Sequence, residues 1–143
     1  MFHRVLVGWD CSPGAAAALH AAAAIASGDA ARVVALAVLK PVHAESRDEG
    51  AADLAGRRQF AQETFTKARD GLDGATRARV SLRFAESTDP ARVICEYADE
   101  HGYDLLVLGR HGTGGVLHPR LGHVAESAAK RSRLPVLLAG NQP

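Results

Sequence analysis

The residues best suited to binding chemistry lie in a glycine-rich stretch near the end of the chain. Two residues separate Gly109 from Gly112, and nine separate Gly112 from Gly122. An apolar run at 104–108 precedes these glycines, and a segment with helical periodicity follows them. Glycine lets the backbone approach a phosphate closely, and the free N–H groups of a helix N-terminus carry partial positive charge. The stretch therefore predicts an anion-binding loop, whereas the alternative is a set of tight turns that binds nothing.

Five arginine and histidine side chains surround these glycines, namely Arg110, His111, His118, Arg120 and His123. Arginine suits phosphate oxygens because its planar guanidinium donates in a fork. We interpret Arg110 and His123 as parts of a polyphosphate clamp. The alternative is a solvated polar loop, which is favoured for His118. A zinc site would also use histidines, but no cysteine pair or HExxH spacing accompanies them.

The Gly-x2-Gly-x9-Gly spacing resembles the nucleotide-binding motif of the universal stress protein family, in the branch that binds ATP. The resemblance covers nearly the whole chain and is weakest between Lys40 and Gly74. In that family a serine or threonine follows the last glycine, whereas this chain has His123. Outside the glycine motif, the resemblance is carried by Val5 to Val7 with Asp10, by residues 104–109 and by Leu134 to Leu138.

Adenine nucleotide is the ligand that this resemblance implies, with ATP expected first and ADP or AMP as alternatives. Asp10 would hydrogen-bond the base or the ribose, although it could instead cap the following helix. Trp9 would form a wall of the crevice, and Val38 would line the adenine pocket through apolar contact. The predicted binding residues are Gly8, Trp9, Asp10, Val38, Leu108, Gly109, Arg110, His111, Gly112, Gly122, His123 and Val124.

The side chain of His123 would affect how the outer phosphates of the nucleotide bind. Its ring can donate a hydrogen bond to a phosphate oxygen and so replace the missing hydroxyl. It is also bulkier than serine, and could fill the space of those phosphates instead. We expect nucleotide to bind, with an altered preference at the outer phosphate, and Mg²⁺ could accompany it.

The composition is that of one domain covering residues 1–143. A formal net charge of +1 gives no bulk attraction to nucleic acid or anionic membrane, so neither is expected as a partner. Cys11 and Cys95 lack a metal or redox spacing, and we interpret them as reduced thiols. The sequence shows no signal peptide and no apolar run of the roughly 18 residues that span a bilayer. We therefore expect a cytoplasmic protein.

The apolar pattern predicts alternating strands and helices. Ser12-Pro13 and Asp89-Pro90 are start signals for two helices. Alternation of apolar and polar residues at 80–84 predicts a strand with one wet face at a sheet edge. Lys40 to Gly56 is interpreted as a loop that becomes a helix between Asp48 and Leu54. The expected strands are 5–8, 33–39, 80–84, 104–108 and 135–139, and the expected helices begin near 13, 48–54, 90 and 123.

This order predicts an α/β fold with a single open, doubly wound, mostly parallel five-stranded sheet and about four helices on both faces. Ligands of such sheets bind beyond the carboxyl ends of the strands, where the strand order reverses. The first and fourth strands would flank that point, so Asp10 and Gly109 would meet at one crevice. The resemblance implies the strand order 3-2-1-4-5.

We consider three hypotheses for the function of this chain. The first is an adenine-nucleotide-binding regulatory protein of the stress response, which the family implies is a homodimer built around the last strand, Pro135 to Ala139. The second is a slow ATPase or other phosphate hydrolase, but the loop from Gly109 to Val124 contains no Asp or Glu. The third is a structural dimer without nucleotide, against which the intact glycine spacing argues. We predict the first, and assign no catalytic residue.

Overall fold

The computed structural model describes residues 1–41, 46–110 and 122–140, which form five strands and five helices. The strands pair in the order β3-β2-β1-β4-β5, and every pairing is parallel. The predicted fold class and strand order are thus confirmed. In chain order the elements are β1 (Arg4–Gly8), α1 (Pro13–Ile25), β2 (Arg32–Leu39), α2 (Arg47–Arg69), α3 (Gly74–Arg77), β3 (Val80–Glu86), α4 (Pro90–Glu100), β4 (Leu105–Gly109), α5 (His123–Arg131) and β5 (Val136–Ala139).

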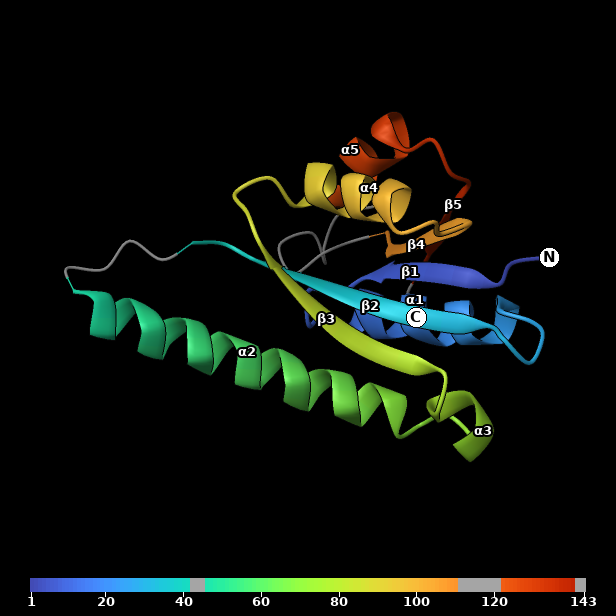
Figure 1. Ribbon diagram of the computed structural model, residues 1–143, viewed down its shortest axis with the longest axis horizontal. Coiled ribbons are helices and arrows are strands. Elements are labelled where there is room, and N and C mark those ends of the chain that lie inside the picture. The colour runs from blue at the N-terminus through green and yellow to red at the C-terminus, as the bar shows by residue number, and fades with distance from the viewer. Residues whose placement is uncertain (42–45, 111–121, 141–143) are drawn as a thin grey trace.

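Helices cover both faces of the sheet, and each face has its own hydrophobic core (Figure 1). The helices α1 and α2 pack on one face around Leu19 and Phe65. The helices α4 and α5 pack on the other face around Leu36 and Leu106. The strand β1 lies between the two cores, and its residues Val5 to Val7 are fully buried. Its continuous apolar run is what a strand covered on both faces requires.

The strand β3 lies at one edge of the sheet, as its alternating sequence predicts. Val80, Leu82 and Phe84 pack toward the core beneath α1 and α2. Ser81 and Arg83 point to the opposite face, where Ser81 is half-buried and Arg83 is exposed. The polar positions of this strand therefore remain close to solvent on the face that carries α4.

Small side chains bring α1 close to the sheet. The Ser12 hydroxyl accepts a hydrogen bond from the N–H of Ala15 (3.1 Å), and Pro13 occupies the first helical position. Ala18 and Ala22 on the buried face are completely inaccessible to solvent. Because alanine adds only a methyl group, the helix backbone can approach the strands more closely than a leucine-rich helix could.

The helix α2 begins earlier than the sequence interpretation placed it. Its N-cap is Ser46, whose hydroxyl accepts from the N–H of Glu49 (3.1 Å), so the helix starts at Arg47 and not between Asp48 and Leu54. Its N-terminal half projects past the carboxyl ends of the strands (Figure 1). In the described part of the chain, no helix is both long enough and apolar enough to cross a membrane.

A short fifth helix, α3, adds to the four that were expected. Asp73 caps it by accepting from the N–H of Thr76 (2.9 Å). This backbone hydrogen bond, with a second one to the Thr76 side chain, lowers the pKa of the Asp73 carboxyl. Four residues give no hydrophobic periodicity, which is why the sequence pattern did not predict α3.

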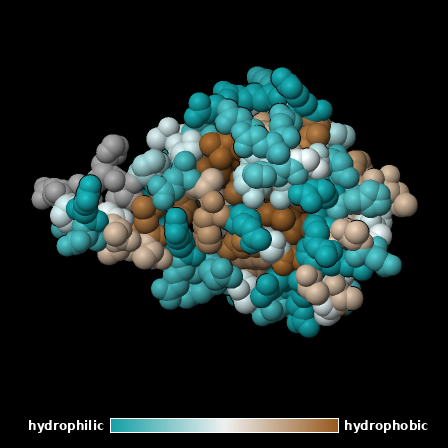
Figure 2. Space-filling model, in the orientation of Figure 1, coloured by the Kyte–Doolittle hydropathy of each residue, from teal (hydrophilic) through white to brown (hydrophobic). Residues whose placement is uncertain are grey.

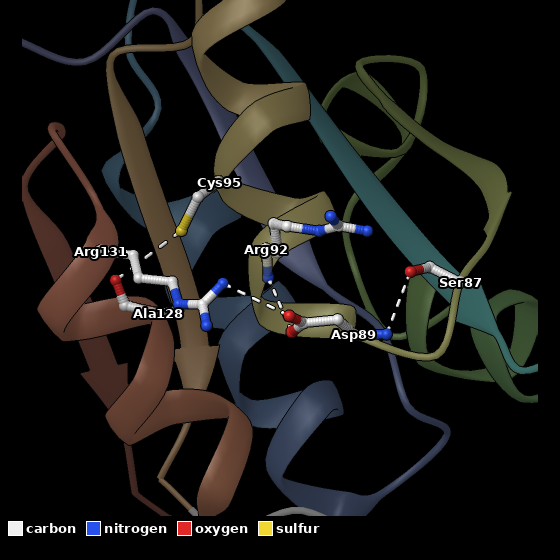
Figure 3. Close-up of polar contacts among 6 residues, drawn as sticks. All are labelled: Ser87, Asp89, Arg92, Cys95, Ala128 and Arg131. Carbon is white, nitrogen blue, oxygen red and sulfur yellow. Dashed lines mark hydrogen bonds and ion pairs between the residues drawn. The ribbon is translucent and has the colours of Figure 1, made fainter.

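A set of polar contacts holds the helices α4 and α5 together (Figure 3). Asp89 caps α4 by accepting from the N–H of Arg92 (3.3 Å), and its second oxygen accepts from the guanidinium of Arg131 at the end of α5 (3.4 Å). The Cys95 thiol points at the carbonyl of Ala128 (3.8 Å), and burial raises its pKa. These contacts fix the direction in which α5 leaves the strand ends.

Candidate functional site

Gly109 lies where the end of β4 touches the first turn of α1. A Cβ atom at this position would lie 2.7 Å from the carbonyl carbon of Gly14 and 2.9 Å from its oxygen. Both contacts are with backbone atoms, so only glycine fits without moving the helix. The carboxyl end of β4 is therefore a place where main chain, without side chains, forms the surface.

The start of α5 lies at the same point. The N–H of Gly122 donates to the carbonyl of Arg110, and the N–H of Arg110 donates to Ala139 of β5 (2.9 Å). Gly122 is the N-cap of α5, and no side chain of the described residues caps the helix. The N–H of Glu126 donates to the carbonyl of Gly122 (2.9 Å), which is the first intrahelical hydrogen bond of α5. Within the described residues, the N–H groups of the first turn have no hydrogen-bond acceptor, which is the arrangement that binds an anion at a helix N-terminus.

Two basic side chains of the predicted clamp flank this point. Arg110 and His123 are both exposed, so their cationic or donor groups face solvent at the mouth of the site. His111 and Gly112, the other predicted residues of the loop, lie outside the described residues, as does the rest of 111–121. Their roles remain predictions.

Asp10 forms part of the turn that precedes α1. One carboxylate oxygen, Oδ1, accepts from the N–H of Ser12 (3.0 Å) and from its hydroxyl. Asp10 is thus a turn residue, as in the alternative that the sequence left open, but the cap of α1 is Ser12 and not Asp10. Asp10 is nevertheless exposed, and its Oδ2 makes no hydrogen bond to any residue that the structure describes. The adjacent Cys11 has a φ of 66°, a conformation that costs a non-glycine residue about 1–3 kcal/mol.

Trp9 does not form an open wall of the crevice. Its side chain is 4% exposed and packs on Phe65 of α2, with ring centroids 5.8 Å apart. The indole Nε1 is buried and has no hydrogen-bond partner among the described residues. The expectation of a wall residue was therefore wrong. Its apolar ring is buried against Phe65 of α2, a helix whose early start the sequence interpretation missed.

The remaining predicted residues lie beneath the crevice on the α4 and α5 side. A Cβ at Gly8 would lie 2.6 Å from the Cδ2 of Leu108, which makes the ends of β1 and β4 neighbours. Val38 near the end of β2 and Val124 in the first turn of α5 are half-buried and pack on the same core. Gly8, Leu108, Val38 and Val124 therefore lie together with Gly109 at the carboxyl ends of the strands.

The structure adds a cleft that the sequence did not predict. It has a volume of about 600 Å³ and lies between the Asp10–Cys11 turn and the projecting half of α2. The exposed ring of Phe60 forms part of its lining, together with Gly56 and Arg57. The missed signal was Ser46 with Glu49 three positions later, a helix-start pattern that would have extended α2 alongside Asp10.

Comparison with known proteins gives one family and several similar folds. The model described as Universal stress protein family matches residues 1–140. The chain is similar in structure to the universal stress protein UspA from Lactobacillus plantarum, at 19% identity and a TM-score of 0.81, with 96% of this chain and 97% of that one covered. It is also similar to a universal stress protein solved in complex with cAMP, at 25% identity and TM-score 0.69, with 97% of each chain covered. A third is the universal stress protein from Archaeoglobus fulgidus in complex with dAMP, at 22% identity and TM-score 0.65, covering 97% and 98%.

Proposed function

The chain belongs to the universal stress protein family, and on that premise we propose that it binds an adenine nucleotide at the carboxyl ends of β1, β2 and β4. The observation that carries the proposal is the meeting of Gly109, which has no room for a side chain, with the start of α5, where no described side chain caps the helix. Main-chain donors and a helix N-terminus at one point favour a phosphate. Structurally similar members have been solved with cAMP and dAMP, which supports an adenine nucleotide.

We assign the phosphates to the start of α5. The N–H groups of the first turn would bind phosphate oxygens, and Arg110 and His123 would contribute charge-assisted hydrogen bonds from the rim. The base would lie toward the ends of β1 and β2, where Val38 offers apolar contact and Asp10 Oδ2 has no hydrogen-bond partner among the described residues. His111 and Gly112 complete the proposed set.

ATP is the proposed ligand, and ADP and AMP are the alternatives. Within the described residues, no three His, Cys, Asp or Glu side chains gather to hold a metal ion. Any Mg²⁺ would therefore be held mainly by the phosphate oxygens of the nucleotide, where it would neutralise their charge. The proposed role is regulatory: a cytoplasmic protein of the stress response whose state follows the adenine nucleotide bound to it.

The experiment is calorimetric titration of ATP, ADP, AMP and cAMP into the purified protein and into Gly122→Val. The wild-type chain should bind, and Gly122→Val should lose about tenfold or more in affinity because the branched side chain covers the first amides of α5. Gly122 has ordinary φ and ψ values, so the variant should fold normally. Gly74→Val, at the first residue of α3, is the matched control and should bind as wild type does.

The substitution His123→Ser tests the assignment of His123. It restores the hydroxyl that the family motif has. A changed preference among ATP, ADP and AMP in this variant would show that the residue at position 123 contacts the outer phosphates. If none of the four nucleotides binds at about 1 mM, the proposed function is wrong.

A further inference from the structure

A second hollow lies at the opposite end of the sheet from the proposed nucleotide site. It has a volume of about 420 Å³, within the range of about 300–1,000 Å³ typical of small-molecule sites. It is lined by residues near the amino ends of β1, β2 and β3 and by residues at the end of α4. Four of its lining side chains are arginines: Arg4, Arg32, Arg79 and Arg83.

Three of these arginines form a row across adjacent strands. Arg4 and Arg32 are directly paired in the register of β1 and β2. The N–H of Val33 donates to the carbonyl of Arg79 (3.0 Å), which places Arg79, the residue immediately before β3, level with Arg32. Neighbouring strands lie about 4.8 Å apart, so the row is about 10 Å long. Like charges in directly opposed positions repel each other and destabilise a sheet.

Arg4, Arg32 and Arg83 point to the face that carries α4, and Arg79 lines the same hollow. Arg4 and Arg32 stand two positions before Leu6 and Val34, which pack on the α4 side, and side chains two apart in a strand share a face. Val34 also lines the hollow. Figure 2 shows hydrophobic surface in the middle of the molecule over β2 and β3, with hydrophilic residues around it. Val34 and Ala78 are the aliphatic residues of the lining, which is otherwise polar or aromatic.

No carboxylate of the described residues forms an ion pair with these four guanidinium groups. Arg4 donates to the carbonyl of His101 at the end of α4 (2.9 Å), and Arg32 and Arg83 donate to neighbouring backbone carbonyls (2.8 and 3.1 Å). Asp104, the acidic residue beside Arg4, is engaged by the backbone N–H groups of His3 and Arg4. A guanidinium has five N–H donors, so most donors of Arg4, Arg32 and Arg83 have no acceptor among the described residues.

Two tyrosines form the wall of the hollow on the α4 side. The rings of Tyr97 and Tyr103 are stacked with centroids 5.9 Å apart, and the guanidinium of Arg4 lies 5.1 Å from the centroid of Tyr103. Burial raises the pKa of Tyr103 to about 12, although Arg4 and Arg83 act in the opposite direction. The phenol is therefore uncharged at neutral pH and adds no negative charge to the hollow.

We propose that this hollow is a second anion site that binds a small compound with two or more linked phosphate groups. A guanidinium matches phosphate oxygens in a fork geometry, and three such groups in a row exceed what one phosphate can contact. A chain of linked phosphates would lie along the row, pair with the cations and relieve their mutual repulsion. The site is separate from the nucleotide crevice, because it uses the amino ends of the strands.

The test is calorimetric titration with inorganic triphosphate. The wild-type protein should bind it about tenfold more tightly than orthophosphate, and Arg32→Gln/Arg79→Gln should lose about tenfold or more of that affinity. Arg47→Gln/Arg92→Gln removes the same net charge from exposed positions outside the hollow, and should bind as wild type does. A rise in melting temperature of Arg32→Gln/Arg79→Gln without ligand would independently support the repulsion in the row.

Arg110→Gln separates this hollow from the nucleotide crevice. Loss of triphosphate binding in Arg110→Gln, with retention in Arg32→Gln/Arg79→Gln, would place the probe at the start of α5 and overturn the proposal. Equal weakening in the Arg47→Gln/Arg92→Gln control would show nonspecific charge attraction, and would also overturn it. Equal affinity for orthophosphate and triphosphate would exclude a ligand with linked phosphates.

Discussion

Both the fold and the proposed nucleotide site require a glycine at position 109. The backbone of Gly14 occupies the position that a side chain would need, so α1 can lie against β4 only if residue 109 is glycine. Gly56 is the opposite case, since nothing lies within 4 Å of a Cβ added there and the residue is inside α2. The same substitution should therefore have opposite effects at the two positions.

Gly109→Ala should lower the free energy of unfolding by about 1–3 kcal/mol, because the new methyl group must displace helix backbone. Gly56→Ala should raise it by about 0.5–1 kcal/mol, because alanine loses less conformational freedom in a helix. Urea unfolding followed by circular dichroism measures both. A stabilised Gly109→Ala variant would mean that α1 does not touch the end of β4.

Tyr103 makes the stability of the protein depend on alkaline pH. The folded protein retains the phenol proton up to about pH 12, whereas an unfolded tyrosine releases it near its ordinary pKa of 10.0. Between these values the folded state binds more protons, so its stability is complete below pH 10 and falls as the pH rises toward 12. Tyr103→Phe should lose less stability over this interval than wild type does.

The measurement is a series of urea midpoints between about pH 9 and about pH 12 for wild type and Tyr103→Phe. Titration of the phenolate absorbance should show one of the two tyrosines ionising at a higher pH than the other. Parallel pH profiles for wild type and Tyr103→Phe would contradict the assignment of the shift to Tyr103.

At the scale of elements, Asp89 joins the beginning of α4 to the end of α5. Its carboxylate caps one helix and pairs with Arg131 of the other (Figure 3). Asp89→Ala should cost about 1–2 kcal/mol of unfolding free energy, of which the cap contributes about 1. Asp89→Asn keeps a capping oxygen and loses only the exposed ion pair, so it should cost about 0.5 kcal/mol or less.

Thermal denaturation of the two variants separates the cap from the ion pair. A second measurement, amide exchange in the first turn of α5, should be faster in Asp89→Ala than in wild type because the helix is less firmly held. If Asp89→Asn is as unstable as Asp89→Ala, the ion pair and not the cap is the important contact.

The elements that sequence predicted best are those with long apolar runs or strong caps. The buried strands and the starts of α1 and α4 follow from short-range signals, and their order determines the sheet topology. The early start of α2 was also present in the sequence, as Ser46 and Glu49, but the polar residues around it concealed it. The position of Trp9 was not predictable from local pattern, because it depends on where Phe65 of α2 comes to lie.

The same distinction applies to the candidate site. Glycine spacing and the position after a buried strand identified Gly109 and Gly122, since both depend on neighbours in the sequence. The cleft beside Asp10 depends on α2, which comes from about 40–50 residues further along the chain, and such contacts leave no periodic signal. The row of arginines likewise required the register of three strands.

At the scale of the whole molecule, β5 leaves one edge of the sheet without a partner strand in the described part of the chain. Leu106 pairs with Val136, and its N–H donates to Pro135, so in a parallel ladder the N–H of Val136 points away from β4. All four residues of β5 are only half-buried. An apolar edge of this kind invites pairing with another chain, and we propose that a second copy covers it in a homodimer.

Sedimentation should show a dimer for wild type and a shift toward monomer for Val136→Pro, which removes the outward N–H without removing a bond to β4. Val136→Ala is the control, because it loses the side chain and keeps that N–H. Amide exchange of β5 should slow as protein concentration rises. A wild-type protein that sediments as a monomer at all concentrations would rule out this interface.

The hydrogen bond from Gly122 to Arg110 brings the chain back to the place where it left β4. The eleven residues between them, 111–121, therefore begin and end at one anchored point of the scaffold. Replacement of residues 111–121 by a segment of different length or composition should therefore leave the positions of the sheet and the helices unchanged.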